Sequence, residues 1–286
     1  MNKAPDTDFQ QQKAVNDYFQ ARSLQWKDIY RNGGVHAEII RDRHATVLAW
    51  IDNLALAPGS AVLEVGCGAG FMAIALAQRG LRVHAIDSSD GMIEQARCNA
   101  EEAGITNRLS LDVGDVYSLA FEDGYFDLVI AIGVIPWLER PELAIQELSR
   151  VTRLSGHVIF TTANRAGLVS YLDPWRNPAL APLKQGMKNV LKRVGLHQRS
   201  PSMSFHNSYF IDKSLARVGL VKMRGMTRGF GLSFHHHAII PEPLGTRLHY
   251  RLQRLADRNI PGFRSMGMAY FVLARKTVTC ERHLEV

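Results

Sequence analysis

VLEVGCGAGF, residues 62–71, is the most informative stretch of this 286-residue chain. An apolar run that holds a single acid, Glu64, breaks into three glycines at alternate positions, Gly66, Gly68 and Gly70. A helical spacing of apolar residues follows at once. This order predicts a strand, a tight turn and a helix, because glycine adopts the unusual backbone angles that such a turn requires. Bare main chain at a helix N-terminus binds ligands well, so the stretch predicts a cofactor pocket.

Strands and helices alternate around this turn. Continuous apolar strand patterns separated by helical patterns are typical of a parallel sheet that is covered on both faces. The expected strands are residues 61–65, 82–86, 109–112, 126–132, 157–162, 220–226 and 268–274, and the expected core helices are residues 71–79, 91–103, 141–151 and 208–218. The pattern predicts an α/β protein with a Rossmann-like, doubly wound sheet.

The chain on either side of this core is less regular. Residues 1–13 indicate a mobile terminus, and helices are expected over residues 14–25 and 37–53. Residues 164–208 and 227–261 break the strand pattern and are interpreted as cap insertions after the fifth and sixth strands. The expected organisation is one structural domain in three parts: an N-terminal helical arm or lid (1–56), a core (57–163), and a part with the insertions and the remaining strands (164–286).

Composition indicates an ordinary globular protein. Apolar residues make up 46% of the chain, and no apolar run reaches the ~20 residues of a membrane span. The start, MNKAPDTDFQQQK, lacks the apolar segment of a secretion signal. The three cysteines, Cys67, Cys98 and Cys280, form neither a disulfide framework nor a metal-ligand spacing. We therefore expect reduced thiols, no metal site and a cytoplasmic location.

Charge is distributed unevenly along the chain. Residues 1–163 carry 14 Lys and Arg against 21 Asp and Glu, and residues 164–286 carry 20 against 6, so their net charges are −7 and +14. Within the basic part, residues 184–199 place lysine and arginine among apolar residues at helical spacing. Such a helix suits an anionic lipid surface, an acidic carrier protein or an anionic substrate, and it equally suits a solvated face that covers the core.

Two further acids lie at the ends of expected strands. Asp87 ends the second strand, where a carboxylate can accept hydrogen bonds from two ribose hydroxyls. The alternative is a cap of the next helix, a role that Ser88 or Ser89 can fill. Asp115, in the turn after the third strand, suits an amine such as that of adenine, or is an ordinary turn aspartate. Phe71 stands where dinucleotide dehydrogenases carry a further glycine, which disfavours a nicotinamide cofactor.

Four segments resemble, in order and spacing, the motifs of the class I S-adenosylmethionine-dependent methyltransferases of small-molecule type. They are VLEVGCGAG, VHAIDSSDGMIEQAR, GDVYSLAFEDGYFDLVIAIGVIPWL and LSRVTRLSGHVIFTT, within residues 61–162. The resemblance implies S-adenosylmethionine as the cofactor and a seven-stranded sheet whose last strand, residues 268–274, is antiparallel. One departure is Arg153-Leu154-Ser155-Gly156, where the family usually carries Lys-Pro-Gly or Arg-Pro-Gly, and we interpret it as a changed turn.

The resemblance also implies binding roles for residues of this chain. The expected cofactor-binding residues are Glu64, Gly66, Gly68 and Gly70 at the methionine part, Asp87 at the ribose, Met92, Asp115 and Val116 at the adenine, Ile132 and Gly133 beside the transferred methyl group, and also Cys67 and Ser88. In small-molecule members the N-terminal arm often folds over the cofactor as a lid. The aromatic residues of the arm are expected either to line such a lid, since aromatic faces suit a sulfonium cation, or to pack the arm onto the sheet. They are Tyr18, Phe19, Trp26 and Tyr30.

A general base helps methyl transfer when the acceptor must lose a proton. His36 in the arm and His206 before the late helix are the candidate catalytic residues. His235, His236 and His237 are further candidates. Three consecutive residues rarely converge on one metal ion, so we expect a polar loop there.

The sequence therefore predicts methyl transfer to a small-molecule or lipid-like metabolite at an oxygen, nitrogen, sulfur or carbon acceptor. An alternative is methylation of an anionic lipid, a quinone or a carrier-bound intermediate at a membrane surface, with peripheral contact through residues 184–199. A nicotinamide-dependent oxidoreductase and a non-catalytic binding protein are the alternatives from other classes. The chain has no Asn-Pro-Pro-Tyr-like motif and no RNA-binding module, which disfavours nucleic acid. Both a monomer and a homodimer fit the sequence.

Overall fold

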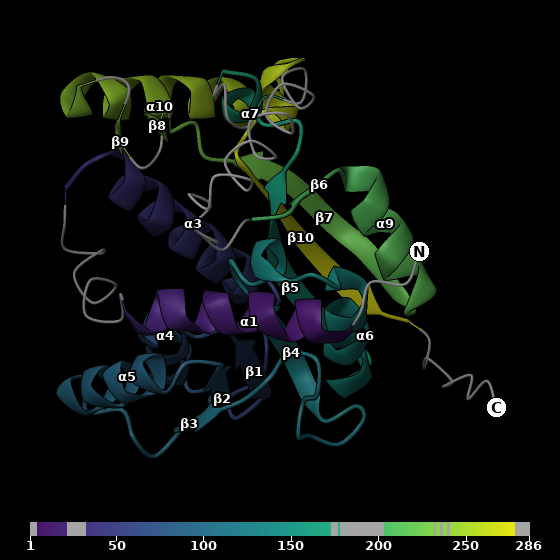
Figure 1. Ribbon diagram of the computed structural model, residues 1–286. Helices are drawn as coiled ribbons and strands as arrows, with labels where there is room; N and C mark the ends of the chain where they lie inside the picture. Colours follow the sequence, from purple (N-terminus) through teal and green to yellow (C-terminus); the bar gives the residue numbers. More distant parts are fainter. Residues whose placement is uncertain are drawn as a thin grey trace.

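The computed structural model describes residues 5–21, 33–172, 177, 203–231, 233–234, 237–238 and 241–277. A central sheet with helices on both faces forms the core (Figure 1). Its strands follow the order β3-β2-β1-β4-β5-β10-β7. In this order their bounds are Leu109–Val113, Arg82–Asp87, Ala61–Val65, Phe126–Ala131, Thr152–Asn164, Ala269–Lys276 and Leu220–Arg228. A short strand, β6 (Phe205–His206), pairs with the end of β5.

The directions of the strands agree with the sequence. The pairs β1–β2, β2–β3, β1–β4 and β4–β5 are parallel, whereas β10 is antiparallel to both β5 and β7. This confirms the α/β class, the doubly wound sheet and the antiparallel last strand. The strand order reverses between β1 and β4, and in open α/β sheets the carboxyl ends at such a point form the ligand-binding crevice.

Both faces of the sheet are buried. All five residues of β1 are buried, because alternate side chains enter two separate apolar clusters. Leu63 lies in the cluster that α6 and α9 cover, and Val62 lies in the cluster that α3, α4 and α5 cover. The helices are α3 (Val35–Asp52), α4 (Phe71–Gln78), α5 (Asp90–Glu102), α6 (Pro141–Val151) and α9 (Ser208–Arg217). Two-sided burial explains why the strands are continuous apolar runs.

The N-terminal helix is longer than the sequence indicates. α1 spans Pro5–Gln20, so the expected mobile terminus is wrong for residues 5–13. Because this segment is polar, it has no apolar stripe that would signal a helix, although proline is favoured in a first helical turn. In Figure 1 α1 passes in front of the sheet, and its contacts reach from α5 to the segment after β4.

β5 is also longer than expected. It begins at Thr152, so residues 153–156, which we expected to form a turn, belong to the strand. The pairing of β5 with β4 shifts between Phe126 and Leu128, and Ser155 has a φ of 63°. The extra residues are accommodated as an irregularity inside the strand, which the apolar pattern alone does not reveal.

The insertion after β7 packs on the arm. Helix α10 spans Glu242–Asp257. Its first residue, Glu242, accepts a hydrogen bond from Val35 N through Oε2 at 2.8 Å. Further along, Tyr250 Oη donates to Glu38 Oε2 of α3 at 2.6 Å. Arg228, the last residue of β7, pairs with Asp42 of α3 through Nε at 2.7 Å and Nη2 at 2.8 Å. This insertion is thus fastened to α3.

The remaining elements are short. They are η1 (Ile135–Trp137), α7 (Leu168–Leu172), β8 (Ser233–Phe234), β9 (His237–Ala238) and η3 (Phe263–Ser265). The basic helix expected at residues 184–199 lies outside the described residues. In the described part of the chain, none of the helices has both the length and the apolar character that crossing a membrane requires.

Candidate functional site

The glycine turn between β1 and α4 adopts left-handed backbone angles. The φ angles of Gly66, Gly68 and Gly70 are 70°, 53° and 78°. A Cβ on Gly66 would collide with Val134, and one on Gly70 would lie 2.9 Å from Ala96 Cβ, so these two glycines allow close packing. At Gly68 a Cβ would meet nothing within 4 Å. The open space of the turn therefore lies at Gly68.

The N–H groups of this turn are used inside the protein. Gly66 N and Cys67 N donate to Ile86 O at 2.8 and 3.0 Å, and Gly70 N donates to Cys67 O at 3.0 Å. Gly68 N donates to Asp87 Oδ2 at 2.9 Å. We expected bare main-chain donors here, and the described bonds occupy four of them. A turn whose donors are occupied and that adjoins acids suits a cation better than a pyrophosphate.

Asp87 ends β2 and supports the turn. Besides Gly68 N, it accepts a hydrogen bond from Ser89 N through Oδ1 at 3.0 Å. Burial raises the pKa of Asp87, and the N–H donors of Gly68, Ser89 and Ser88 oppose this rise. The cap of α5 is Ser89, whose Oγ accepts from Met92 N at 3.3 Å. The capping alternative for Asp87 is therefore wrong, because the serine fills that role.

Glu64 is an acid inside the core beside the turn. It is 4% exposed, and its Oε2 has no hydrogen-bond partner. Burial raises the pKa of Glu64 to about 8, the N–H of Ala73 lowers it, and Asp87 raises it further. A buried carboxyl oxygen without a partner is costly, so a ligand that offers a donor there would be bound favourably. The methionine ammonium of S-adenosylmethionine is such a donor, and the residues present fit this group.

Cys67 and Met92 are both buried. Cys67 lies in the apolar cluster under α3 and α4, and burial raises the pKa of its thiol well above the usual value. Met92 lies in the first turn of α5, next to the end of β2.

Ser88 is bonded to α1, since its Oγ donates to Asn16 Oδ1 at 2.9 Å.

Asp115 and Val116 follow β3 at the same edge. Asp115 is exposed, and its Oδ1 accepts from Tyr117 N at 3.0 Å. The second carboxylate oxygen takes no part in this bond. Val116 is buried in the apolar cluster under α6. Asp115 is thus a turn residue whose carboxylate still faces solvent, which is compatible with both alternatives drawn from the sequence.

Ile132 and Gly133 lie at the carboxyl end of β4. Gly133 N donates to Thr161 Oγ1 of β5 at 2.8 Å, and its φ is 78°. A Cβ on Gly133 would lie 3.2 Å from Arg43 Nη1, so α3 places a guanidinium at this point. Arg43 was not among the site residues expected from the sequence, although it lies three residues after the buried Ile40 and four before the buried Val47 of α3.

α1 connects the two ends of this edge. Its Gln20 Oε1 accepts from Ser89 Oγ at 2.7 Å and from Gly91 N at 2.9 Å, both at the start of α5. The same turn of α1 also contacts the segment after β4, because the Tyr18 and Phe19 rings lie 5.9 and 5.3 Å from the Trp137 ring of η1. Trp26 and Tyr30 lie outside the described residues. The contacts of Asn16 with Ser88, of Gln20 with the start of α5 and of Trp137 with α1 were not expected from the sequence, because nothing in their local pattern indicates these partners.

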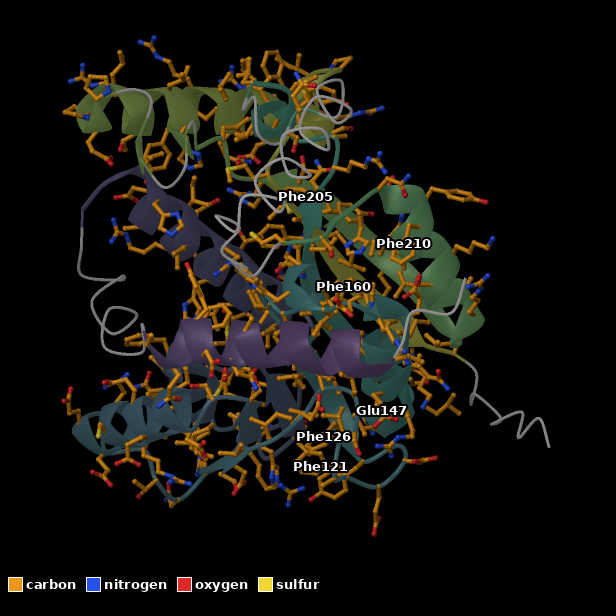
Figure 2. All side chains as sticks on the ribbon, in the orientation of Figure 1. Phe121, Phe126, Glu147, Phe160, Phe205 and Phe210 are labelled. Carbon is orange, nitrogen blue, oxygen red and sulfur yellow. The ribbon has the colours of Figure 1, made fainter. Side chains whose placement is uncertain are left out.

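The two candidate bases lie apart. His206 belongs to β6, which pairs with the end of β5. Its Nδ1 lies 2.9 Å from Thr162 Oγ1. Its ring stacks on the ring of Phe210, which Figure 2 labels, at 4.8 Å between centroids. Burial lowers the pKa of His206, against a raising effect of Glu142. His36 is exposed in the first turn of α3, next to the Val35–Glu242 contact. His206 thus lies at the carboxyl end of β5, near Gly133, whereas His36 lies at the start of α3, near the start of α10.

Of the three consecutive histidines, His235 and His236 lie outside the described residues, as does the side chain of His237. Among the side chains that the structure does describe, no three His, Cys, Asp or Glu residues gather as a set of metal ligands.

The parallel sheet, its crevice at β1 and β4, and the acid-flanked glycine turn define a nucleotide-binding α/β protein of Rossmann-like type. Residues 63–160 match the methyltransferase-domain family. The ubiquinone biosynthesis O-methyltransferase of Paracidovorax citrulli is 36% identical over 119 residues, which are 41% of this chain and 50% of that protein. The norajmaline N-methyltransferase of Rauvolfia serpentina is 31% identical over 134 residues, 46% of this chain and 43% of that protein. Residues 63–160 of this chain therefore form a methyltransferase domain, and the chain resembles the class I S-adenosylmethionine-dependent methyltransferases.

Solved structures agree with the fold. The magnesium protoporphyrin IX methyltransferase of Synechocystis PCC 6803 with bound SAH (S-adenosylhomocysteine) superposes with a TM-score of 0.60 at 21% identity, covering 93% of this chain and 99% of that one. The chain spans about half or less of the length of the two curated relatives named above.

Proposed function

We propose that the protein transfers the methyl group of S-adenosylmethionine to a small-molecule or lipid-like acceptor. The observation that carries this proposal is the buried Glu64, whose Oε2 lacks a partner beside a turn with open space at Gly68. Glu64 ionises when a cationic group binds beside it, and with Asp87 it suits the positive charges of the cofactor. A nicotinamide dinucleotide carries an anionic pyrophosphate instead, so the same features disfavour the oxidoreductase alternative.

In this proposal each part of the cofactor has its own residues. They are Glu64, Gly66, Cys67, Gly68 and Gly70 for the methionine, Asp87 and Ser88 for the ribose, Met92, Asp115 and Val116 for the adenine, and Ile132 and Gly133 for the surroundings of the methyl group. When bound, the sulfonium supplies an activated methyl group. The chain has to bring the acceptor close to it and collinear with the breaking bond, and to exclude water. In this proposal α1, with Tyr18, covers the site.

His206 is the proposed general base. With the Thr162 hydroxyl accepting from Nδ1–H, the lone pair is at Nε2 and can take the proton that an acceptor hydroxyl or amine loses. Burial keeps this imidazole neutral near pH 7, as a base requires. His36 remains the alternative base, and it would need an acceptor that reaches from the methyl group toward α10.

Two experiments test the function. Isothermal titration with SAH and with NADH separates the cofactors, and binding of NADH without binding of SAH would contradict the proposal. Incubation with radiolabelled S-adenosylmethionine and a fractionated metabolite pool then identifies the acceptor. SAH binding without label transfer to any fraction would favour the non-catalytic binding protein.

Methylation at a membrane surface is a second candidate, which the charge of +14 over residues 164–286 favours. Sedimentation with vesicles that contain anionic lipid tests it. Binding that disappears at high salt is expected for a peripheral electrostatic contact, whereas no sedimentation with these vesicles would exclude it.

A further inference from the structure

The loop between β3 and β4, residues 114–125, is fastened to α6 by one arginine. Arg150 donates through Nη2 to Leu119 O at 2.8 Å and through Nη1 to Phe121 O at 2.8 Å. Nη1 also bonds Asp123 Oδ1 at 2.7 Å. A single guanidinium therefore joins three points of one loop, which its planar fork of donors permits.

Glu147 of α6 completes this arrangement. Its Oε2 accepts from Leu119 N at 3.0 Å, and its two oxygens accept from Arg150 Nε at 2.7 Å and Nη2 at 2.8 Å. The main chain of Leu119 is thus held by its N–H and its carbonyl oxygen together. Figure 2 shows Glu147 beside the loop that carries Phe121.

Two properties make this pair stronger than an ordinary surface ion pair. The side chains of Arg150 and Glu147 are only 19% and 20% exposed, and the contact is bidentate. The start of the loop is fastened as well, since Arg140 N at the N-cap of α6 donates to Tyr117 Oη at 3.2 Å. Tyr117 N in turn bonds Asp115 Oδ1.

We propose that the Glu147–Arg150 pair positions this loop for recognition of the adenine base of the cofactor. The inference rests on the proposed function, in which Asp115 and Val116 bind the adenine. Asp115 is exposed and lies near the start of the loop between β3 and β4. Loops are generally more mobile than helices and strands, so its carboxylate needs a fixed backbone to meet an exocyclic amine. In this proposal α6 supplies that backbone geometry from outside the site, and Glu147 and Arg150 act through their bonds to the loop.

The variant Arg150→Gln tests the proposal through selectivity for the base. Calorimetry would compare SAH with its inosyl analogue, in which an oxygen replaces the exocyclic amine. We expect the Kd of SAH to rise about tenfold in Arg150→Gln, while the Kd of the analogue changes less than about twofold. Glu147→Gln keeps an acceptor for Leu119 N, and a smaller loss in the same direction is expected. This variant carries the test if Arg150→Gln does not fold.

Arg153→Gln is the matched control, because it breaks the 2.7 Å Arg153–Asp127 ion pair at the start of β5 and leaves the loop untouched. Its preference for SAH should equal that of the wild type. A double-mutant cycle with Asp115→Ala separates positioning of Asp115 from a purely structural role, because a structural loss of SAH affinity would be the same with and without Asp115. In the Asp115→Ala background, Arg150→Gln should cause almost no further loss of SAH affinity.

Equal losses for both ligands in Arg150→Gln, or an unchanged preference with only a lower unfolding temperature, would overturn this inference and leave the proposed function intact. Failure of the wild-type protein to bind SAH at all would instead overturn the proposed function.

Discussion

Asp87 Oδ2 accepts a hydrogen bond from Gly68 N at 2.9 Å, so the acid at the end of β2 holds the turn that follows β1. Two adjacent strands are thereby joined at the crevice. One carboxylate supports the shape of the pocket and, in the proposed function, also contacts the ribose.

Replacing Asp87 should therefore weaken cofactor binding strongly. Asp87→Ala removes the acceptor for Gly68 N and Ser89 N together with the proposed ribose contact, and we expect the Kd of SAH to rise at least about tenfold. Gly68→Val should have a similar effect, because its side chain would enter the open space of the turn at a φ of 53°. Asp112→Ala on β3, whose carboxylate accepts from Ser110 Oγ, is the control in isothermal titration. Unchanged binding in both pocket variants would show that the pocket is misplaced.

The buried Glu64 should make stability and binding depend on pH. Its folded-state pKa of about 8 lies above the ordinary value of 4.5, so the folded protein binds more protons between these values. The free energy of unfolding should therefore fall as the pH rises from 4.5 to 8. Glu64→Gln stays neutral and should flatten this dependence in denaturant titrations.

The same group should release a proton when a cationic ligand binds. A ligand ammonium favours the ionised carboxylate, so SAH affinity should rise with pH below 8 in the wild type and not in Glu64→Gln. Calorimetry in two buffers of different ionisation enthalpy measures the released proton directly. Identical enthalpies in the two buffers would contradict a role of Glu64 at the ligand ammonium.

Lys276 should matter for stability and not for the cofactor. This residue ends β10, is 5% exposed, and donates through Nζ to Ser149 O and Thr152 O, both at 2.7 Å. These carbonyls belong to the end of α6, where a buried ammonium satisfies acceptors that the helix leaves unpaired. Lys276→Met keeps the apolar stem and should lower the free energy of unfolding by about 2–3 kcal/mol. The neighbouring Arg275→Met is the exposed control, and equal losses in the two variants would refute the capping role.

The proposed base should appear in the pH profile of turnover. Once an acceptor is found, kcat of the wild type should rise through a pKa below the usual 6.5 of histidine, because burial lowers the pKa of His206. His206→Gln should lower kcat by about a hundredfold and remove this ionisation, with the Kd of SAH unchanged. His157→Gln, in the middle of β5 opposite Leu128 of β4, serves as the control. A loss of kcat in His36→Gln with none in His206→Gln would assign the base to α3.

Much of the core could be predicted because local patterns carry the signal. The strand-turn-helix order at residues 62–71, the acid at residue 87 and the serine cap at residue 89 are all recognisable within a few neighbours. The polar start of α1 and the irregular start of β5 were mispredicted for the opposite reason. Neither has an apolar periodicity of its own, and both depend on what lies next to them in space.

The sequence by itself determined the parallel sheet, the glycine turn and the acids at the strand ends, because periodicity and turn chemistry act between residues close in the chain. Only the tertiary structure decided that Gln20 bonds the start of α5, that Arg43 lies over Gly133, and that Arg150 holds the loop after β3. Such contacts join residues that are far apart in sequence. They follow from how helices pack on the two faces of the sheet, which no local pattern records.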